Sequence, residues 1–324
     1  MREMGGYLPL ELRDTGEYFR GIPDEWIGRY DCGRTALYAA IQALGAKKVW
    51  IPYFYCPSVW KFLSDLGIEL KAYHINEELL PGDIPENTDD VVLIINYYGI
   101  LDGKVKEYVQ THRNIIIDNA LSFYSTPIIR QDIMNMYSCR KFFGVSDGAY
   151  LIGMSEQKLE LKSGESNQRA SFLLKSIECG TNAAYADSLK NEELFGRGFY
   201  SMSKLTYRIL KSIDYEGVKQ KRINNFHYLH KRMKKWQKLN VLEEDYPAYC
   251  YPLLLDEDIR SKLIEQKMYI PTLWKELICD KFEGTLEYKF SKNLLCLPMD
   301  QRYGIEEMEY MCSVIEHELT GRRK

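Results

Sequence analysis

The feature that most constrains the fold is a pair of short, wholly apolar runs, VVLII at 91–95 and III at 115–117, with a helix-like stretch between them. A strand that is apolar on both faces has to be covered on both faces, as the strands of parallel sheets are. Strand-like and helix-like segments alternate around these runs, and GRTALYAAIQALG at 33–45 has the apolar spacing of a helix that stops at a glycine. The alternation predicts an α/β core with a mostly parallel sheet flanked by helices.

The chain divides by character into a large and a small domain. Residues 1–238 are predicted to form the large α/β domain, with residues 1–30 as an N-terminal strap, and residues 239–324 a smaller α+β domain. The predicted strands of the large domain are at 49–53, 70–76, 91–99, 114–118, 133–139 and 148–153, and its helices at 33–45, 57–67, 103–113, 155–168 and 202–236. The small domain is predicted to hold strands at 248–255 and 293–299 and helices at 256–267 and 305–319.

Charge and composition argue against several kinds of partner. The formal net charge of -3 and the pI near 6.1 give no reason to expect a nucleic acid or an anionic membrane. The basic stretch at 218–238 carries Phe226, Leu229, Met233 and Trp236 at helical spacing, so we interpret it as a helix with a core face and a solvated basic back.

Location and metal content are inferred from features that the sequence lacks. No apolar run reaches the roughly 18 residues of a membrane span, and the N-terminus lacks a signal-peptide layout, so we expect a cytoplasmic protein without a membrane partner. The 8 cysteines are scattered, with no C-x-x-C pair and no histidine at ligand spacing. We therefore predict reduced thiols and no metal site.

Three polar features fall at the ends of predicted strands or the start of a helix, where ligands of parallel α/β sheets gather. In Cys32-Gly33-Arg34-Thr35 the free backbone N–H groups of a helix start attract an anion, and Arg34 adds a cation. Asp118 is a carboxylate at the end of the run 115–117. In Ser138-x-x-Lys141, a lysine lies between two apolar runs.

Each feature also has an ordinary structural explanation. Gly33 can simply ease entry into a helix, Asp118 can cap the next segment, and Lys141 can snorkel out from a strand end. A buried lysine, in contrast, has a lowered pKa and becomes a usable nucleophile or base. Together the three features fit the needs of pyridoxal phosphate (PLP): an anion site for the phosphate, a carboxylate for the pyridine nitrogen and a lysine for a Schiff base. Gly-x-Gly-x-x-Gly and Walker patterns are absent, which argues against dinucleotides and nucleoside triphosphates.

From Gly33 to the C-terminus the sequence resembles the DegT/DnrJ/EryC1/StrS family, the sugar aminotransferases among PLP enzymes with the aspartate aminotransferase fold. The resemblance is carried by GRTALYAAIQALG followed by VWIPYFYCPSV, by NYYG and IIIDNALS, by the segment around Lys141 with the later Asp147-Gly148, and by NLLCLPMDQRYGIEEMEYM. It implies fold type I, with a mostly parallel seven-stranded sheet and a smaller C-terminal α+β domain.

The resemblance also implies roles for the site residues. Lys141 would hold the cofactor and, once released, carry a proton between the substrate and the cofactor, while Asp118 would pair with the pyridinium nitrogen. The residues implied to hold the phosphate are Gly33, Arg34, Thr35, Ser138 and Arg140.

Two departures concern the cofactor ring. The family has an aromatic residue stacked on the ring where this chain has Cys56, so either Tyr55 takes over the stacking or a thiol lies against the ring. The family glutamine that often bonds the cofactor's phenolic oxygen is replaced by Leu121, and Asn96 or Ser122 could substitute for it.

Two further departures weaken the inherited substrate rather than the cofactor. A threonine is usual where Arg34 stands. The Asn-Tyr-Arg-Met block, which helps to complete the neighbouring subunit's site in the family, is only faintly echoed at 199–202. A homodimer is expected from the resemblance alone.

The function that these features predict is transfer of an amino group from an amino acid, by resemblance glutamate, to a keto group of a nucleotide-linked sugar, with Lys141 as general acid and base. Two alternatives stay open at this point. One is a PLP-dependent lyase or dehydratase on the same fold, although the family's dehydratases replace the lysine with histidine. The other is a regulatory protein that binds PLP without catalysis.

Overall fold

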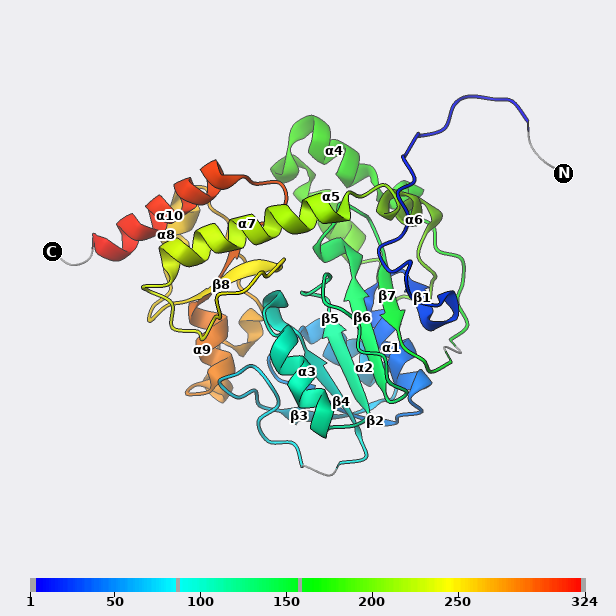
Figure 1. The fold of residues 1–324 in the computed structure, drawn as a ribbon, viewed down its shortest axis with the longest axis horizontal. Coiled ribbons are helices and arrows are strands. Elements are labelled where there is room, and N and C mark those ends of the chain that lie inside the picture. Colours follow the sequence, from blue (N-terminus) through cyan, green and yellow to red (C-terminus); the bar gives the residue numbers. More distant parts are fainter. Residues whose placement is uncertain (1–3, 86–87, 157–158, 322–324) are drawn as a thin grey trace.

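In the computed structural model, which describes residues 4–85, 88–156 and 159–321, the large domain is built on one seven-stranded sheet (Figure 1). The strand order is β1-β7-β6-β5-β4-β2-β3. Strand β7 runs antiparallel to both of its neighbours, and all the other strands are parallel to one another. The strands are β1 (Ile27–Tyr30), β2 (Lys48–Pro52), β3 (Glu69–Tyr73), β4 (Val91–Ile95), β5 (Ile115–Asn119), β6 (Ile133–Ser138) and β7 (Ala149–Ile152). The predicted α/β sheet is confirmed.

Helices cover both faces of this sheet. The chain moves in one direction across the sheet from β1 through β2 to β3, and in the opposite direction from β4 to β5. Because crossovers between parallel strands are right-handed, α1 (Gly33–Ala43) and α2 (Pro57–Asp65) lie on one face and α3 (Asp102–Thr111) on the other, as Figure 1 shows. Every residue of β4, β5 and β6 is buried, which is why β4 and the first three residues of β5 are apolar on both faces.

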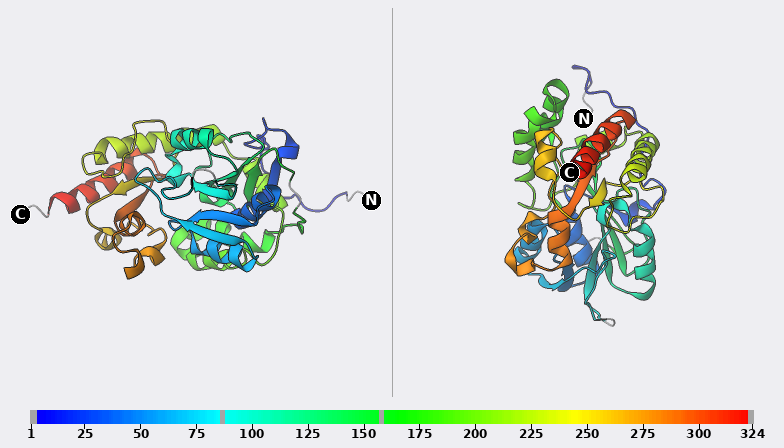
Figure 2. Two further views of the ribbon diagram at one scale, coloured as in Figure 1. Left: turned by 90° about the horizontal axis from the view of Figure 1, so that it is seen from below. Right: turned by 90° about the vertical axis from the view of Figure 1, so that its left-hand side faces the viewer.

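The C-terminal part forms a second, smaller layer beside the sheet (Figure 2). Its strands β8 (Cys250–Leu254) and β9 (Leu294–Pro298) are antiparallel. Its helices are α8 (Arg260–Glu265), α9 (Leu286–Asn293) and α10 (Ile305–Thr320). Helix α7 (Tyr215–Met233) packs on α10 and β8 through Phe226, Leu229 and Met233, as the periodicity predicts. A domain boundary at residue 238 stays a prediction.

One predicted element is wrong and one strand was missed. The last residues of the segment predicted as an N-terminal strap form β1, the edge strand beside β7. The segment 155–168, of which 157–158 lie outside the described residues, is not a helix. Lys162 instead exchanges backbone hydrogen bonds with Phe199 and Ser201, and a Cβ on Gly164 would overlap the Ser201 carbonyl oxygen. The pairing joins residues that are far apart in the sequence, so the apolar periodicity of 155–168 could not reveal it.

The helices predicted around residues 155–236 fall later and in more pieces. They are α4 (Ser171–Cys179), α5 (Thr181–Glu192), α6 (Lys204–Leu210) and α7. Gly180 joins α4 to α5 with a φ of 83°, which favours glycine. Asp214 accepts a hydrogen bond from the Gly217 N–H and so starts α7 separately from α6. Within the described ranges, no helix is both long and apolar enough to span a membrane.

Candidate active site

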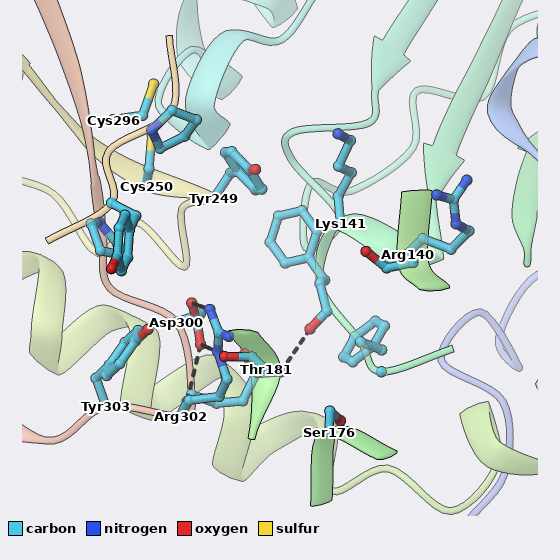
Figure 3. Close-up of a pocket in the computed structure, with 18 of the residues that line it drawn as sticks. Arg140, Lys141, Ser176, Thr181, Tyr249, Cys250, Cys296, Asp300, Arg302 and Tyr303 are labelled. Atoms are coloured by element: carbon cyan, nitrogen blue, oxygen red, sulfur yellow. Dashed lines mark hydrogen bonds and ion pairs between the residues drawn. The ribbon is translucent and has the colours of Figure 1, made fainter. Parts of the chain in front are cut away.

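Lys141 lies at the edge of a cavity of about 850 Å³ between the sheet domain, the α4–α5 hairpin and the C-terminal layer (Figure 3). The residue ends a short 3-10 turn, η3 (Cys139–Lys141), that directly follows β6. Phe142 and Phe143, the next two residues, are buried in an aromatic core, so the turn is anchored on both sides. The apolar residues before and after Lys141 are buried, and they hold its amine at the wall of the cavity.

The environment of Lys141 favours the neutral amine. Its side chain is exposed to the open space of the cavity, but protein surrounds it closely enough that burial lowers its pKa. The positive charge of Arg140 lowers the pKa further, while Cys56 and Asp118 act in the opposite direction. Lys141, Asp118 and Cys56 are therefore close enough to sense one another's charge.

Asp118 is a buried carboxylate, 1% exposed, near the carboxyl end of β5. Its Oδ1 accepts a hydrogen bond of 2.7 Å from the Ala120 N–H, and its Oδ2 accepts one from the Tyr55 hydroxyl. Burial raises the pKa of Asp118 to about 6, although these two hydrogen bonds and the charge of Lys141 lower it. Each carboxylate oxygen can accept two hydrogen bonds, so Asp118 retains acceptor capacity.

Tyr55 and Cys56 lie between β2 and α2, on the side of Asp118. Tyr55 is 6% exposed and donates its hydroxyl hydrogen to Asp118. Cys56 is half-buried at the start of α2, with its sulfur 3.1 Å from the Ser58 hydroxyl. Both residues lie near Asp118. Which of them faces the cofactor's pyridine ring stays a prediction.

The start of α1 lies near a group of arginines. Gly33, whose Cβ would approach the Met136 sulfur to 3.3 Å, opens the helix with unpaired N–H groups. The Thr35 hydroxyl is not directed to a ligand, because it donates a hydrogen bond of 2.7 Å to Asp31 and is fully buried. Thr35 can therefore contribute its backbone N–H but not its side chain.

Arg34, Arg140 and Arg169 form what we call the arginine cluster. The guanidinium groups of Arg140 and Arg169 each lie 4.3 Å from the centre of the Phe195 ring, and that of Arg34 lies beside Gly196, the next residue. Burial, and the charges of Arg169 and Arg34, lower the pKa of Arg140 to about 10. Three like charges held together indicate a site for a multiply charged anion.

One donor of the arginine cluster is fully buried and has no partner among the described residues. Arg140 forms an ion pair with Glu192, and Arg169 donates a hydrogen bond of 2.8 Å from Nε to Asn191. Nη2 of Arg169 is buried without a hydrogen-bond partner. Sequence analysis missed Arg169, because nothing in the polar stretch around it distinguishes it from a surface arginine.

The loop after Lys141 is tied to α6 by Asp147 and Gly148. The Asp147 carboxylate accepts hydrogen bonds from the backbone N–H and hydroxyl of Ser203 and from the Thr206 hydroxyl. Gly148 has a φ of 115°, and a Cβ there would lie 2.9 Å from Thr206 Cγ2. This pair of residues is structural.

The remaining predicted site residues differ in their placement. Asn96 faces a separate small cavity and uses its amide on Asp102, Asn119 and Ser125, so we do not include it in the site. Ser122 is likewise bonded to Ser125. Ser138 is 9% exposed, and its hydroxyl bonds none of the described residues.

The far wall of the cavity carries charged groups that sequence analysis did not identify. Asp300 and Arg302 form a two-pronged ion pair there with Tyr303 beside it, and Tyr249 also lines the cavity (Figure 3). Arg222, from α7, also lines the cavity although it is 1% exposed. Within the described ranges, no group of three or more His, Cys, Asp or Glu side chains could hold a metal ion.

We compared the sequence and the fold with those of known proteins. No family model matches the sequence, and no curated protein sequence matches it. Among solved structures, DesV of S. venezuelae in complex with a ketimine intermediate aligns at a TM-score of 0.61 and 13% identity, over 95% of this chain and 90% of that one. A DegT DnrJ EryC1 StrS aminotransferase from Brucella abortus aligns at 0.58 and 12%, over 90% and 85%. The chain has the PLP-dependent aminotransferase fold.

A third similar structure performs a different reaction on the same fold. The E. coli GDP-4-keto-6-deoxy-D-mannose-3-dehydratase with bound hydrated PLP aligns at a TM-score of 0.58 and 14% identity, over 93% of this chain and 92% of that one. The predicted fold type, with its small C-terminal sheet, is thus confirmed, and the reaction has to be argued from this chain's own residues.

Proposed function

We propose that the chain is a PLP-dependent aminotransferase that moves an amino group from an amino acid, with glutamate as the expected donor, to a keto group of a nucleotide-linked sugar. The observation that carries the proposal is the amine of Lys141 at a cavity wall, within electrostatic reach of the buried Asp118 carboxylate. The similarity to sugar aminotransferase structures supports the substrate class.

The residues fit the cofactor. Lys141 supplies the amine that would hold it, and Asp118 supplies a negative charge for the pyridine nitrogen. The orphaned Nη2 of Arg169, together with Arg34 and Arg140, suits a phosphate, because a buried guanidinium donor without a partner is costly.

Bound PLP would supply an electron sink for the bonds of the substrate's reacting carbon. With PLP bound, Lys141 would take up a proton at one carbon and return it at another, a role that requires the neutral amine, and burial, which lowers the pKa of Lys141, favours that form. An ionised Asp118 would favour a protonated ring nitrogen. The arginine cluster would bind the phosphate end and so help to orient the cofactor towards Lys141.

We further propose a cytoplasmic homodimer. All 8 cysteines are free thiols, as expected of a protein in a reducing compartment. Helix α4 has no buried residue, and its Leu174 and Ile177 are 65% and 80% exposed, which supports a subunit contact at that helix.

The test is an absorbance spectrum of the purified protein with PLP, recorded before and after glutamate is added. We expect a lysine-bound cofactor band that glutamate shifts to the amine form, and its loss in Lys141→Ala. Lys267→Ala, which removes another lysine of the same cavity wall, should keep the band.

Other spectra would point elsewhere. A band that glutamate does not change, with conversion of a keto-sugar, indicates the lyase or dehydratase alternative. A stable band without any turnover indicates a regulatory protein. A protein that takes up no PLP contradicts the proposal altogether.

A further inference from the structure

The carboxylate of Asp118 accepts a hydrogen bond from a tyrosine that belongs to a distant part of the sheet. One oxygen bonds the N–H of Ala120 at 2.7 Å, a contact within the same turn, and the other bonds the hydroxyl group of Tyr55, 63 residues away. Tyr55 follows β2 and Asp118 lies on β5, and β4 separates these two strands. The bond from Tyr55 therefore reaches past a neighbouring strand and has no part in forming a turn or a helix cap.

The loop around Tyr55 is held in place by its own backbone. The Tyr55 N–H donates a hydrogen bond of 2.8 Å to the carbonyl of Tyr53, and the carbonyl of Phe54 accepts one of 2.6 Å from the hydroxyl of Tyr97. Phe54 and Tyr55 are 1% and 6% exposed. The phenol is thus held against Asp118 by packing as well as by its hydrogen bond.

This hydrogen bond acts on the charge of Asp118. Burial raises the pKa of Asp118 to about 6, and the bond from Tyr55 lowers that pKa more than the backbone hydrogen bond or the charge of Lys141 does. In return, burial and the charge of Asp118 raise the pKa of Tyr55 well above its usual value, with smaller contributions from Cys56 and Tyr97. Because Tyr55 keeps its proton, it donates to the carboxylate and carries no charge that would repel it.

We propose that Tyr55 is a positioning residue of the cofactor site that keeps the Asp118 carboxylate ionised and oriented for the pyridine nitrogen, a proposal that rests on the proposed function. A carboxylate and a pyridine in contact share one proton, and a donor bonded to the carboxylate favours the form with the proton on nitrogen. The protonated ring is the form that withdraws electrons. This role uses the hydroxyl group, so it does not depend on which residue stacks on the ring.

Carbon NMR of the cofactor-free protein, isotope-labelled at the side-chain carboxyl carbon of aspartate, tests the effect on Asp118. The Asp118 signal is identified by its loss in Asp118→Asn, and it should titrate with a midpoint near pH 6. In Tyr55→Phe the midpoint should rise by about one to two pH units, the shift expected when a hydrogen bond to a charged group is lost. Tyr53→Phe is the matched control, because Tyr53 lies in the same loop but packs against His74. Its midpoint should equal that of the unaltered protein.

A second measurement needs no variant at position 55. In protein labelled at the phenolic carbon of tyrosine, one tyrosine signal should shift with the same midpoint as the Asp118 carboxyl, because its hydrogen bond weakens when the acceptor loses its charge. This shift should disappear in Asp118→Asn. If no tyrosine signal depends on Asp118 in this way, the bond on which the proposal rests does not exist in solution.

Nitrogen NMR of the protein loaded with PLP, isotope-labelled at the ring nitrogen, tests the effect on the cofactor. The signal should have the chemical shift of a protonated pyridine, and in Tyr55→Phe it should move towards that of a neutral one. An unchanged Asp118 midpoint in Tyr55→Phe overturns the proposal, as does a ring-nitrogen signal that does not move. If the unaltered protein takes up no PLP, the proposed function fails, whereas the carbon titration still reports on Tyr55, so the two failures are distinguishable.

Discussion

Replacing Asp118 with asparagine should stabilise the cofactor-free protein at neutral pH while weakening its cofactor binding. Asp118 is 1% exposed, and burial raises its pKa from 3.8 to about 6 against the influence of Tyr55, Ala120 and Lys141. The ionised carboxylate is therefore costly in the absence of a cationic ligand. Asparagine has nearly the same shape and can still accept the Ala120 hydrogen bond.

The magnitude can be worked out from linkage between protonation and folding. An acid with a raised native-state pKa stabilises the fold when protonated, below about pH 4, and that contribution is lost as the pH rises through about 6. A shift of about two units corresponds to about 3 kcal/mol of unfolding free energy. The net shift already contains the attraction of Lys141, and asparagine reproduces the protonated acid only in part because it cannot keep both hydrogen bonds in the same form, so we expect a gain of about 1–3 kcal/mol at pH 7.5, which is about 1.5–4.5 °C in Tm for a chain of this size.

Circular dichroism melts of cofactor-free protein between pH 4 and 8 measure this directly. The Tm of Asp118→Asn should exceed that of the unaltered protein by an amount that increases as the pH rises from 4 to 7. Asp90→Asn is a control of opposite sign, since Lys71 holds the pKa of Asp90 below its usual value although burial acts to raise it. A variant that is no more stable at pH 7.5, or a difference that persists at pH 4, would refute the reasoning.

Two further substitutions test the surroundings of Lys141. Arg169→Gln should lower the affinity for PLP and for inorganic phosphate about 10- to 100-fold, because it removes a buried cationic donor that has no partner among the described residues. Equilibrium dialysis measures this, with the exposed Arg197→Gln as the control. Asp147→Ala should lower the unfolding free energy by about 3 kcal/mol or more, because three donors of Ser203 and Thr206 lose their acceptor. Urea unfolding checks this second prediction, and a loss below about 1 kcal/mol would contradict it.

Much of the fold could be predicted because its signals are local. The runs at 91–95 and 115–117 must be covered on both faces, and the structure buries every residue of β4 and β5. The α1 helix has its apolar stripe where the periodicity places it. In contrast, β1 depends on pairing with β7, more than a hundred residues away, and the four residues IGRY carry no periodicity of their own.

The site divides in the same way. Lys141 and Asp118 could be found because each interrupts or ends an apolar run, so their placement is set by the strands. Arg169 and Arg222 could not, since each lies in a polar or basic stretch where most arginines are solvated. Arg169 is half-buried against Phe195 and Arg222 is buried against Phe142, aromatic rings contributed from other parts of the chain.

The arginine cluster also explains how this chain could hold a phosphate with few hydroxyl groups. The Thr35 hydroxyl is consumed by Asp31, so the start of α1 contributes backbone N–H groups alone. In the proposed site Arg34, Arg140 and Arg169 would replace the missing hydrogen bonds with charge, and the Phe195 ring contacts the guanidinium groups of Arg140 and Arg169. All three arginines belong to one chain, so the proposed phosphate site would draw its charge from a single subunit.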